Sequence, residues 1–180
     1  MNKLNEVSQW KEVGDGEAFV LNLKKQYQIL LEAGDMSKAF AKIDDQYFTL
    51  RKLQYPKTTF LLESETTKMS ISMGSNFWED AGLVLLSSSG RQFTWQYRNI
   101  PVSDFTFFDE QGLEVMKFQP DSLKEGLPKV TFKESEEADY LLLLGTFFLL
   151  TNADGYWLNG NIESTPLLAE EGFQRSMMLS

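Results

Sequence analysis

The side chains of this sequence that could perform acid–base chemistry are carboxylates in adjacent pairs. These pairs are Asp44-Asp45, Glu79-Asp80, Asp109-Glu110 and Glu170-Glu171. A catalytic acid and base must face the same reacting atoms, but neighbours on a strand or helix point in different directions. The chain has no histidine and no cysteine, which excludes Ser-His-Asp and Cys-His catalysis and the usual zinc and copper sites. We therefore predict solvated turns at these pairs, no catalytic or metal-binding residues, and a protein that is not an enzyme.

One segment partly matches a calcium-binding loop. Asn152, Asp154 and Gly155 follow the order of an EF-hand. When Gly155 is aligned with the invariant glycine of that loop, Leu150 replaces the first acidic ligand and Asn161 replaces the bidentate glutamate. The sequence also lacks the glycine-rich motifs that hold phosphates. We expect no calcium site here and no cofactor.

The most unusual loop places two aromatic side chains beside two acids, between two glycines. Its residues are Phe77, Trp78, Glu79 and Asp80. Aromatic side chains dominate the strongest contacts of protein interfaces, so these four residues are the candidate partner-binding site. The structural alternative is that Trp78 folds back onto the edge of the core.

Charge limits the partners of this chain. It contains 26 acidic and 17 basic residues, a net charge of −9, which repels phosphate backbones and anionic lipid head groups. We expect no nucleic-acid partner. Lipid binding is disfavoured but stays open, and a protein partner that is itself basic would be attracted. The alternative is that the charge serves solubility alone.

The sequence predicts a cytoplasmic location. Residues 1–10 are polar and no apolar signal segment follows them, and the absence of cysteine favours a reducing compartment. The longest apolar run, Tyr140 to Leu150, is shorter than the roughly 20 residues that span a bilayer. We therefore expect no transmembrane segment.

Hydrophobic spacing divides the chain into three parts and predicts an α+β fold. Apolar residues in 1–46 recur at one, three and four positions, which is typical of helices and predicts a helical hairpin that turns at Gly34. Residues 47–158 form an antiparallel β-rich core, either a meander or a barrel, because short alternating segments are separated by turn residues. Its expected strands cover 48–53, 60–63, 69–73, 83–86, 93–97, 105–108 and 113–118. Residues 159–180 are a tail that can form a short helix.

A buried apolar segment ends the β-rich core, near residues 136–151. Ser135 followed by Glu136, Glu137 and Asp139 makes a helix N-cap with an acidic first turn, which favours a helix. Gly145 and the aromatic residues after it are compatible with a pair of strands. Either structure must be enclosed by protein, because it is apolar on every side.

The β-rich core contains a candidate internal repeat with an offset of 45 residues. Phe48-Thr49, Pro56 and Phe60 match Phe93-Thr94, Pro101 and Phe105. Each copy would be a strand, a turn marked by proline and a returning strand. The alternative is a chance match.

Two segments resemble the tubby C-terminal superfamily, which includes phospholipid scramblases and LURP-one-related proteins. They are the strand–turn–strand sequence of 105–115 and the apolar sequence of 138–150. The resemblance covers about residues 47–152 and implies a closed β-barrel around a hydrophobic helix. The basic lipid-binding cluster of tubby proteins has no counterpart in this chain.

These observations leave three functional hypotheses. The first is a non-enzymatic binding or regulatory protein that acts through protein contacts. The second is an acidic protein of the bacterial immunity or chaperone type, which neutralises a basic partner. The third, implied only by the resemblance, is a lipid-associated tubby-like barrel. A carboxylate-based hydrolase is a weaker fourth.

Overall fold

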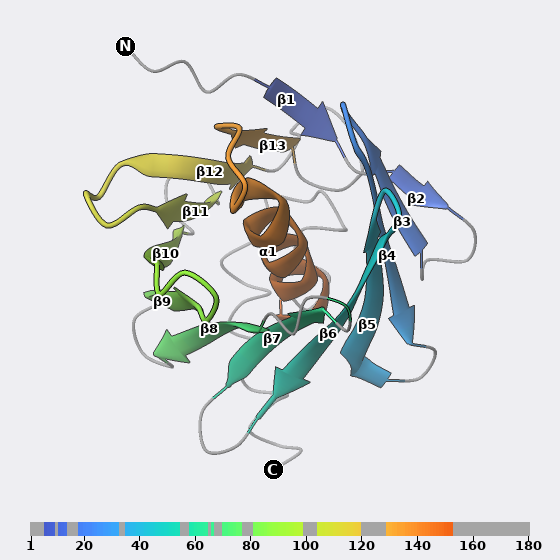
Figure 1. Cartoon of the computed structure of the whole chain (residues 1–180), viewed down its shortest axis with the longest axis horizontal. Coiled ribbons are helices and arrows are strands. Elements are labelled where there is room, and N and C mark those ends of the chain that lie inside the picture. Colours follow the sequence, from blue (N-terminus) through green and yellow to red (C-terminus); the bar gives the residue numbers. More distant parts are fainter. Residues whose placement is uncertain are drawn as a thin grey trace, which may run out of the picture.

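The fold is an antiparallel sheet curled around one apolar helix (Figure 1). The computed structural model describes residues 6–9, 11–13, 18–32, 35–54, 58–64, 66, 70–76, 81–98, 104–119 and 129–152. The strands are β1 (Glu6–Gln9), β2 (Lys11–Val13), β3 (Ala18–Asn22), β4 (Gln26–Glu32), β5 (Asp35–Ile43), β6 (Gln46–Leu53), β7 (Thr59–Ser64), β8 (Ser70–Asn76), β9 (Ala81–Leu86), β10 (Gln92–Arg98), β11 (Asp104–Phe108), β12 (Glu114–Gln119) and β13 (Lys129–Phe132). The helix is α1 (Ala138–Asn152).

Strands β2 to β13 form a continuous meander in which each strand pairs with the next along the chain. Strand β1 pairs with β13, so β1 and β2 are the two ends of an open sheet. Gln9 ends β1 and Lys11 begins β2. Because one residue separates them, their Cα atoms lie within about 7 Å. The sheet therefore curls until its ends approach each other, without a ladder between β1 and β2.

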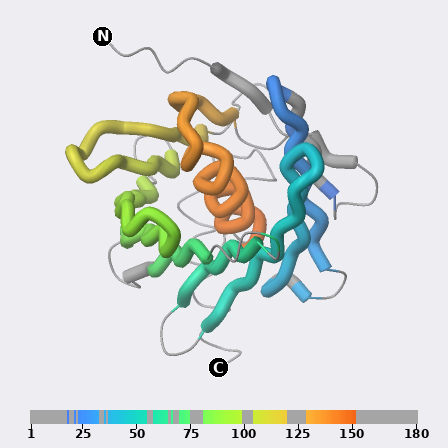
Figure 2. Tube along the Cα trace, in the orientation of Figure 1, coloured from blue at the N-terminus to red at the C-terminus, as the bar shows by residue number. Residues whose placement is uncertain are grey.

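Helix α1 lies inside this curl, where the concave face of the sheet surrounds it (Figure 2). It contacts β5, β7 and β12, and residues 141–150 are all buried. Its aromatic side chains pack on those of the sheet. Phe148 stacks on Phe105 with ring centroids 4.8 Å apart, and Phe147 meets Phe60 edge to face at 6.0 Å. Enclosure by the sheet explains how a helix that is apolar all round can be stable.

A glycine allows α1 to approach the sheet closely. A Cβ atom on Gly145 would lie 2.6 Å from the ring of Phe118 and 2.9 Å from that of Phe107. Real Cβ atoms essentially never approach a neighbour this closely. Both rings are fully buried. Gly145, which as a sequence feature had favoured strands, is thus explained by packing inside a helix.

The predicted N-terminal helical hairpin is wrong, because residues 18–43 form strands β3, β4 and β5. The inward side chains of β4 are Tyr27, Ile29 and Leu31, all buried, whereas Leu30 points outward and is exposed. Counting Leu30 with Leu31 suggested helical spacing. The turn between β3 and β4 contains Lys24 and Lys25, which carry no sequence signal for a turn. Tertiary pairing, not local preference, decides the structure of this part.

The structure confirms the antiparallel strands expected from residue 48 to residue 118, and it shows a helix in the apolar segment near 136–151. The helix begins as predicted, because the amide of Ala138 donates to the hydroxyl of Ser135 at 3.1 Å. The two segments of the candidate 45-residue repeat pair with the same register. Lys52 is opposite Phe60 in β6–β7, and Tyr97 is opposite Phe105 in β10–β11.

The structure contradicts the prediction of a closed barrel and does not test the prediction for the C-terminal tail. The sheet is open in its hydrogen bonding, so the closed-barrel alternative is wrong. The C-terminal tail of 159–180 lies outside the described residues. No helix in the described part of the chain is long and apolar enough to cross a membrane.

Candidate functional site

The predicted partner-binding loop, Phe77 to Asp80, lies outside the described residues. The loop connects strands β8 and β9. The indole nitrogen of Trp95 donates to the carbonyl oxygen of Gly74 at 2.8 Å. A Cβ atom on Gly82 would lie 1.9 Å from that same oxygen. The glycine is therefore needed for Trp95 to pack against the start of β9.

Two of the four carboxylate pairs lie in described turns, as predicted. Asp44 has a φ of 49° and its carboxylate accepts the amide of Gln26 at 2.9 Å. Asp109 accepts the amides of Gln111 and Leu113 at 3.0 and 2.8 Å. Asp109 thus organises its own turn, because aspartate readily accepts hydrogen bonds from the backbone just beyond it, whereas Asp44 joins its turn to the start of β4. The other two pairs lie outside the described residues.

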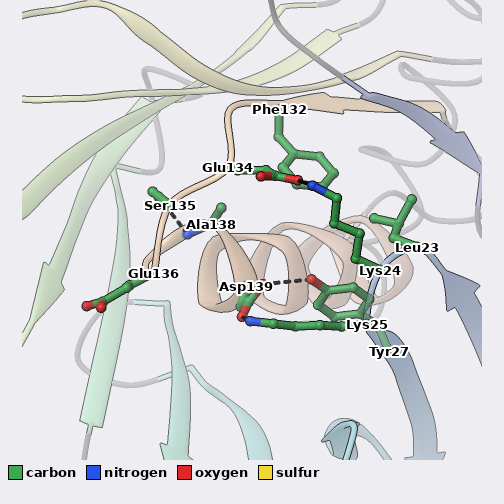
Figure 3. A pocket seen from close by; sticks show the side chains of 10 residues that line it. All are labelled: Leu23, Lys24, Lys25, Tyr27, Phe132, Glu134, Ser135, Glu136, Ala138 and Asp139. Carbon is green, nitrogen blue, oxygen red and sulfur yellow. Dashed lines mark hydrogen bonds and ion pairs between the residues drawn. The ribbon is translucent and has the colours of Figure 1, made fainter.

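A cavity of about 360 Å³ opens at the start of α1 (Figure 3). One wall is the turn between β3 and β4, and the other is the connection from β13 into the helix. Its apolar lining comes from Leu23, Tyr27, Phe132 and Ala138, and its charged lining is Lys24, Lys25, Glu134, Glu136 and Asp139.

Lysines of the β3–β4 turn pair with carboxylates across this cavity. Lys24 Nζ lies 2.5 Å from Glu134 Oε1, and Lys25 pairs with Asp139. The hydroxyl of Tyr27 donates to the other oxygen of Asp139 at 2.7 Å. These contacts tie the turn to the first residues of the helix (Figure 3).

The electrostatics of this end of the helix follow from these pairs. The pKa of Lys25 is raised, mainly because its ammonium donates a hydrogen bond to Asp139. Burial raises the pKa of the Tyr140 hydroxyl, and the charge of Asp139 adds to the effect. Burial alone would raise the pKa of Glu137, but a backbone hydrogen bond and the ion pair with Arg91 outweigh it and lower that pKa.

This arrangement favours a structural use of the cavity's charges. Asp139 accepts from Tyr27 with one oxygen and from Lys25 with the other, so both of its oxygens join the helix to strand β4 and the turn before it. Within the described residues, no group of three or more acidic side chains is arranged to hold a metal ion.

A second candidate site lies on the outer, convex face of strands β4 to β6. We call Leu30, Phe40, Tyr47, Lys38 and Lys42 the β4–β6 patch. Leu30 and Phe40 are directly opposite each other, as are Lys42 and Tyr47. The three apolar side chains are 49%, 44% and 62% exposed. Clustered large apolar side chains at a surface typically mark a binding site.

The two lysines of the patch lie over its aromatic rings. Lys38 Nζ is 4.9 Å from the ring centroid of Phe40, and Lys42 Nζ is 5.3 Å from that of Tyr47. Both distances fall within the range of cation–π attraction. The patch therefore combines an apolar centre with two ammonium groups.

Sequence reasoning did not find this patch, because the helical spacing predicted for residues 1–46 places Leu30 and Phe40 on apolar helix faces. A usable signal was present in residues 38–43. Read with a period of two, Ala39, Ala41 and Ile43 lie on one side, and Phe40 lies on the other between two lysines. All three of the first group are buried, and Phe40 is exposed.

Comparisons of this chain with protein-family models, with curated proteins and with solved structures found no match.

Proposed function

We propose that this protein is a non-enzymatic binding module that acts through a protein contact on the β4–β6 patch. The observation that carries the proposal is the exposure of Leu30, Phe40 and Tyr47 on one face of three adjacent strands. An exposed aromatic pair at the centre of a surface is the composition typical of interface hot spots. The inner face of the same strands is already filled by α1.

The cavity at the start of α1 is a weaker candidate binding site than the β4–β6 patch. Its ammonium groups and two of its carboxylates pair with each other inside the chain. The apolar side chains that line the cavity, such as Tyr27 and Phe132, are buried, whereas those of the β4–β6 patch are exposed, so a partner gains more apolar contact on the patch.

The test uses the full chain as bait in a lysate of the organism that encodes it. The variant Phe40→Ser with Tyr47→Ser removes the aromatic groups, and Leu113→Ser is the matched control because Leu113 is an exposed apolar residue outside the patch. We expect a protein that binds the wild type and the control but not the patch variant, and whose affinity is then measured with purified components. A purified partner whose affinity is the same for the patch variant would contradict the proposal.

We also propose that the chain is related in architecture to the tubby C-terminal superfamily, with an open sheet in place of the closed barrel. The support is an antiparallel meander that curls around a helix whose residues 141–150 are all buried. Shared architecture does not carry function, so lipid association is not part of this proposal. An experimental structure that includes the residues outside the described ranges would test it, and a helix lying outside the sheet would contradict it.

A further inference from the structure

The β4–β6 patch lies on strands that are not at an edge of the sheet, which limits how a partner can bind. Strands β4, β5 and β6 each pair with a neighbour on both sides. A partner strand needs a free sheet edge with unpaired backbone groups. An extended peptide therefore cannot add to the sheet here, and a partner must contact the side chains of the face.

The apolar part of the patch has the size of one face of a short helix. Leu30 and Phe40 are neighbours across two strands, and Tyr47 lies one strand further and two residues along. Neighbouring strands are about 4.8 Å apart and diagonal neighbours about 7–8 Å. The three side chains thus span about 10–13 Å. Helix positions i, i+4 and i+7 cover about 10 Å.

The two lysines flank this apolar centre and are only loosely paired within the chain. Lys38 and Lys42 lie two residues before and after Phe40, on the same face. Lys38 Nζ is 3.4 Å from Glu32, and Lys42 Nζ is 4.0 Å from the fully exposed Asp45. Pairs of this kind at a surface contribute little, so both ammonium groups can exchange these contacts for those of a partner.

We propose that the β4–β6 patch binds an amphipathic α-helix of a partner protein, whose apolar stripe covers Leu30, Phe40 and Tyr47 and whose flanking carboxylates pair with Lys38 and Lys42. Charge complementarity selects an acidic helix, although the chain as a whole is acidic. This inference rests on the proposed function and specifies the partner of the same surface.

The experiment maps two designed helical peptides onto the full isotope-labelled chain by NMR. Both peptides have about 18 residues, long enough to be helical when stapled. They share a leucine stripe at positions i, i+4, i+7 and i+11, with glutamates beside it in one and lysines in the other. We expect the glutamate peptide to shift the backbone amides of 28–32, 38–42 and 47–51, and the lysine peptide to bind at least about tenfold more weakly, since opposite charges attract and like charges repel across an interface.

Charge reversal provides the second arm. The variant Lys38→Glu with Lys42→Glu should lose at least about tenfold in affinity for the glutamate peptide and gain affinity for the lysine peptide. The control, Lys24→Glu with Arg98→Glu, makes the same change in net charge outside the patch and should keep the wild-type preference. Circular dichroism and thermal unfolding check that each variant folds.

Three outcomes overturn the inference. The first is that the lysine peptide binds as tightly as the glutamate peptide or more tightly. The second is that the chain forms a concentration-dependent dimer that disappears with Phe40→Ser and Tyr47→Ser. The third is that phosphatidylserine vesicles shift the same amides and the glutamate peptide does not. Equal or stronger binding of the lysine peptide overturns only the choice of an acidic helix. The proposed function stays in place if a purified partner binds the variant with Phe40→Ser and Tyr47→Ser more weakly than the wild type. The proposed function fails separately, if that variant retains full affinity for its partner.

Discussion

Replacing Gly145 with alanine tests whether the sheet encloses the helix as closely as the structure shows. The added Cβ would lie 2.6 Å from Phe118 and 2.9 Å from Phe107, where ordinary contact begins at 3.4 Å. The overlap with Phe118 is therefore 3.4 minus 2.6, or 0.8 Å. Neither ring can move into solvent, because both are fully buried in the core. The helix or the rings must shift to make room.

Two opposing effects set the magnitude. Overpacking a core costs about 1–3 kcal/mol, and this overlap is severe enough for the upper end of that range. Alanine is preferred over glycine in a helix interior by about 1 kcal/mol, so we expect a net loss of about 2 kcal/mol in the free energy of unfolding. For a chain of this size that corresponds to a fall in melting temperature of about 4–8 °C.

Urea unfolding followed by circular dichroism measures this loss, with Gly74→Ala as the matched control. Gly74 lies in β8, and a Cβ atom there would meet nothing within 4 Å. The control should be unchanged or more stable by about 0.5–1 kcal/mol, because glycine weakens a strand interior. If Gly145→Ala is as stable as Gly74→Ala, the close packing of α1 against β11 and β12 is refuted.

Three further predictions concern the helix start, alkaline pH and the β4–β6 patch. Ser135→Ala removes the N-cap of α1 and should lower the free energy of unfolding by about 1 kcal/mol, measured by urea unfolding; an unchanged value would contradict the capping role. Burial raises the pKa of Tyr140 in the folded state, so the unfolded chain loses its proton first and stability should fall as pH rises above about 10. Tyr140→Phe should make that fall shallower in thermal melts at pH 8–11, and an identical slope would contradict the assignment. Phe40→Ser with Tyr47→Ser should change stability by no more than about 1 kcal/mol, since exposed surface positions contribute within about 0.5 kcal/mol each; a larger loss in calorimetry would show that the patch is part of the core.

The strands from residue 48 to residue 118 could be predicted from sequence because their inward and outward positions differ in polarity. In β8, Ile71 and Met73 alternate with serines, so the period of two is visible. The start of α1 was equally readable, because Ser135 is followed by an acidic first turn. These signals depend only on neighbouring residues, and the structure contains the helix and the Ser135 cap that they predict.

Strands β3 to β5 could not be predicted in the same way. Leu30 and Phe40 are apolar but point outward, so they obscure the alternation that marks a strand. The turn through Lys24 and Lys25 has no glycine, proline or asparagine. Its lysines pair with Glu134 and Asp139, more than 100 residues away, and no local pattern contains such contacts.

The sequence by itself determined that the acidic pairs at 44–45 and 109–110 lie in turns, that antiparallel strands occur between residues 48 and 118, and that the segment near 136–151 must be buried. Composition and hydrophobic period are sufficient for these conclusions, since they depend on residue type and near neighbours. Only the tertiary structure decided that α1 lies inside the curled sheet. The same holds for Leu30, Phe40 and Tyr47, which lie together on the outer face of the sheet. The reason is that strand register and sheet curvature are set by contacts between distant residues.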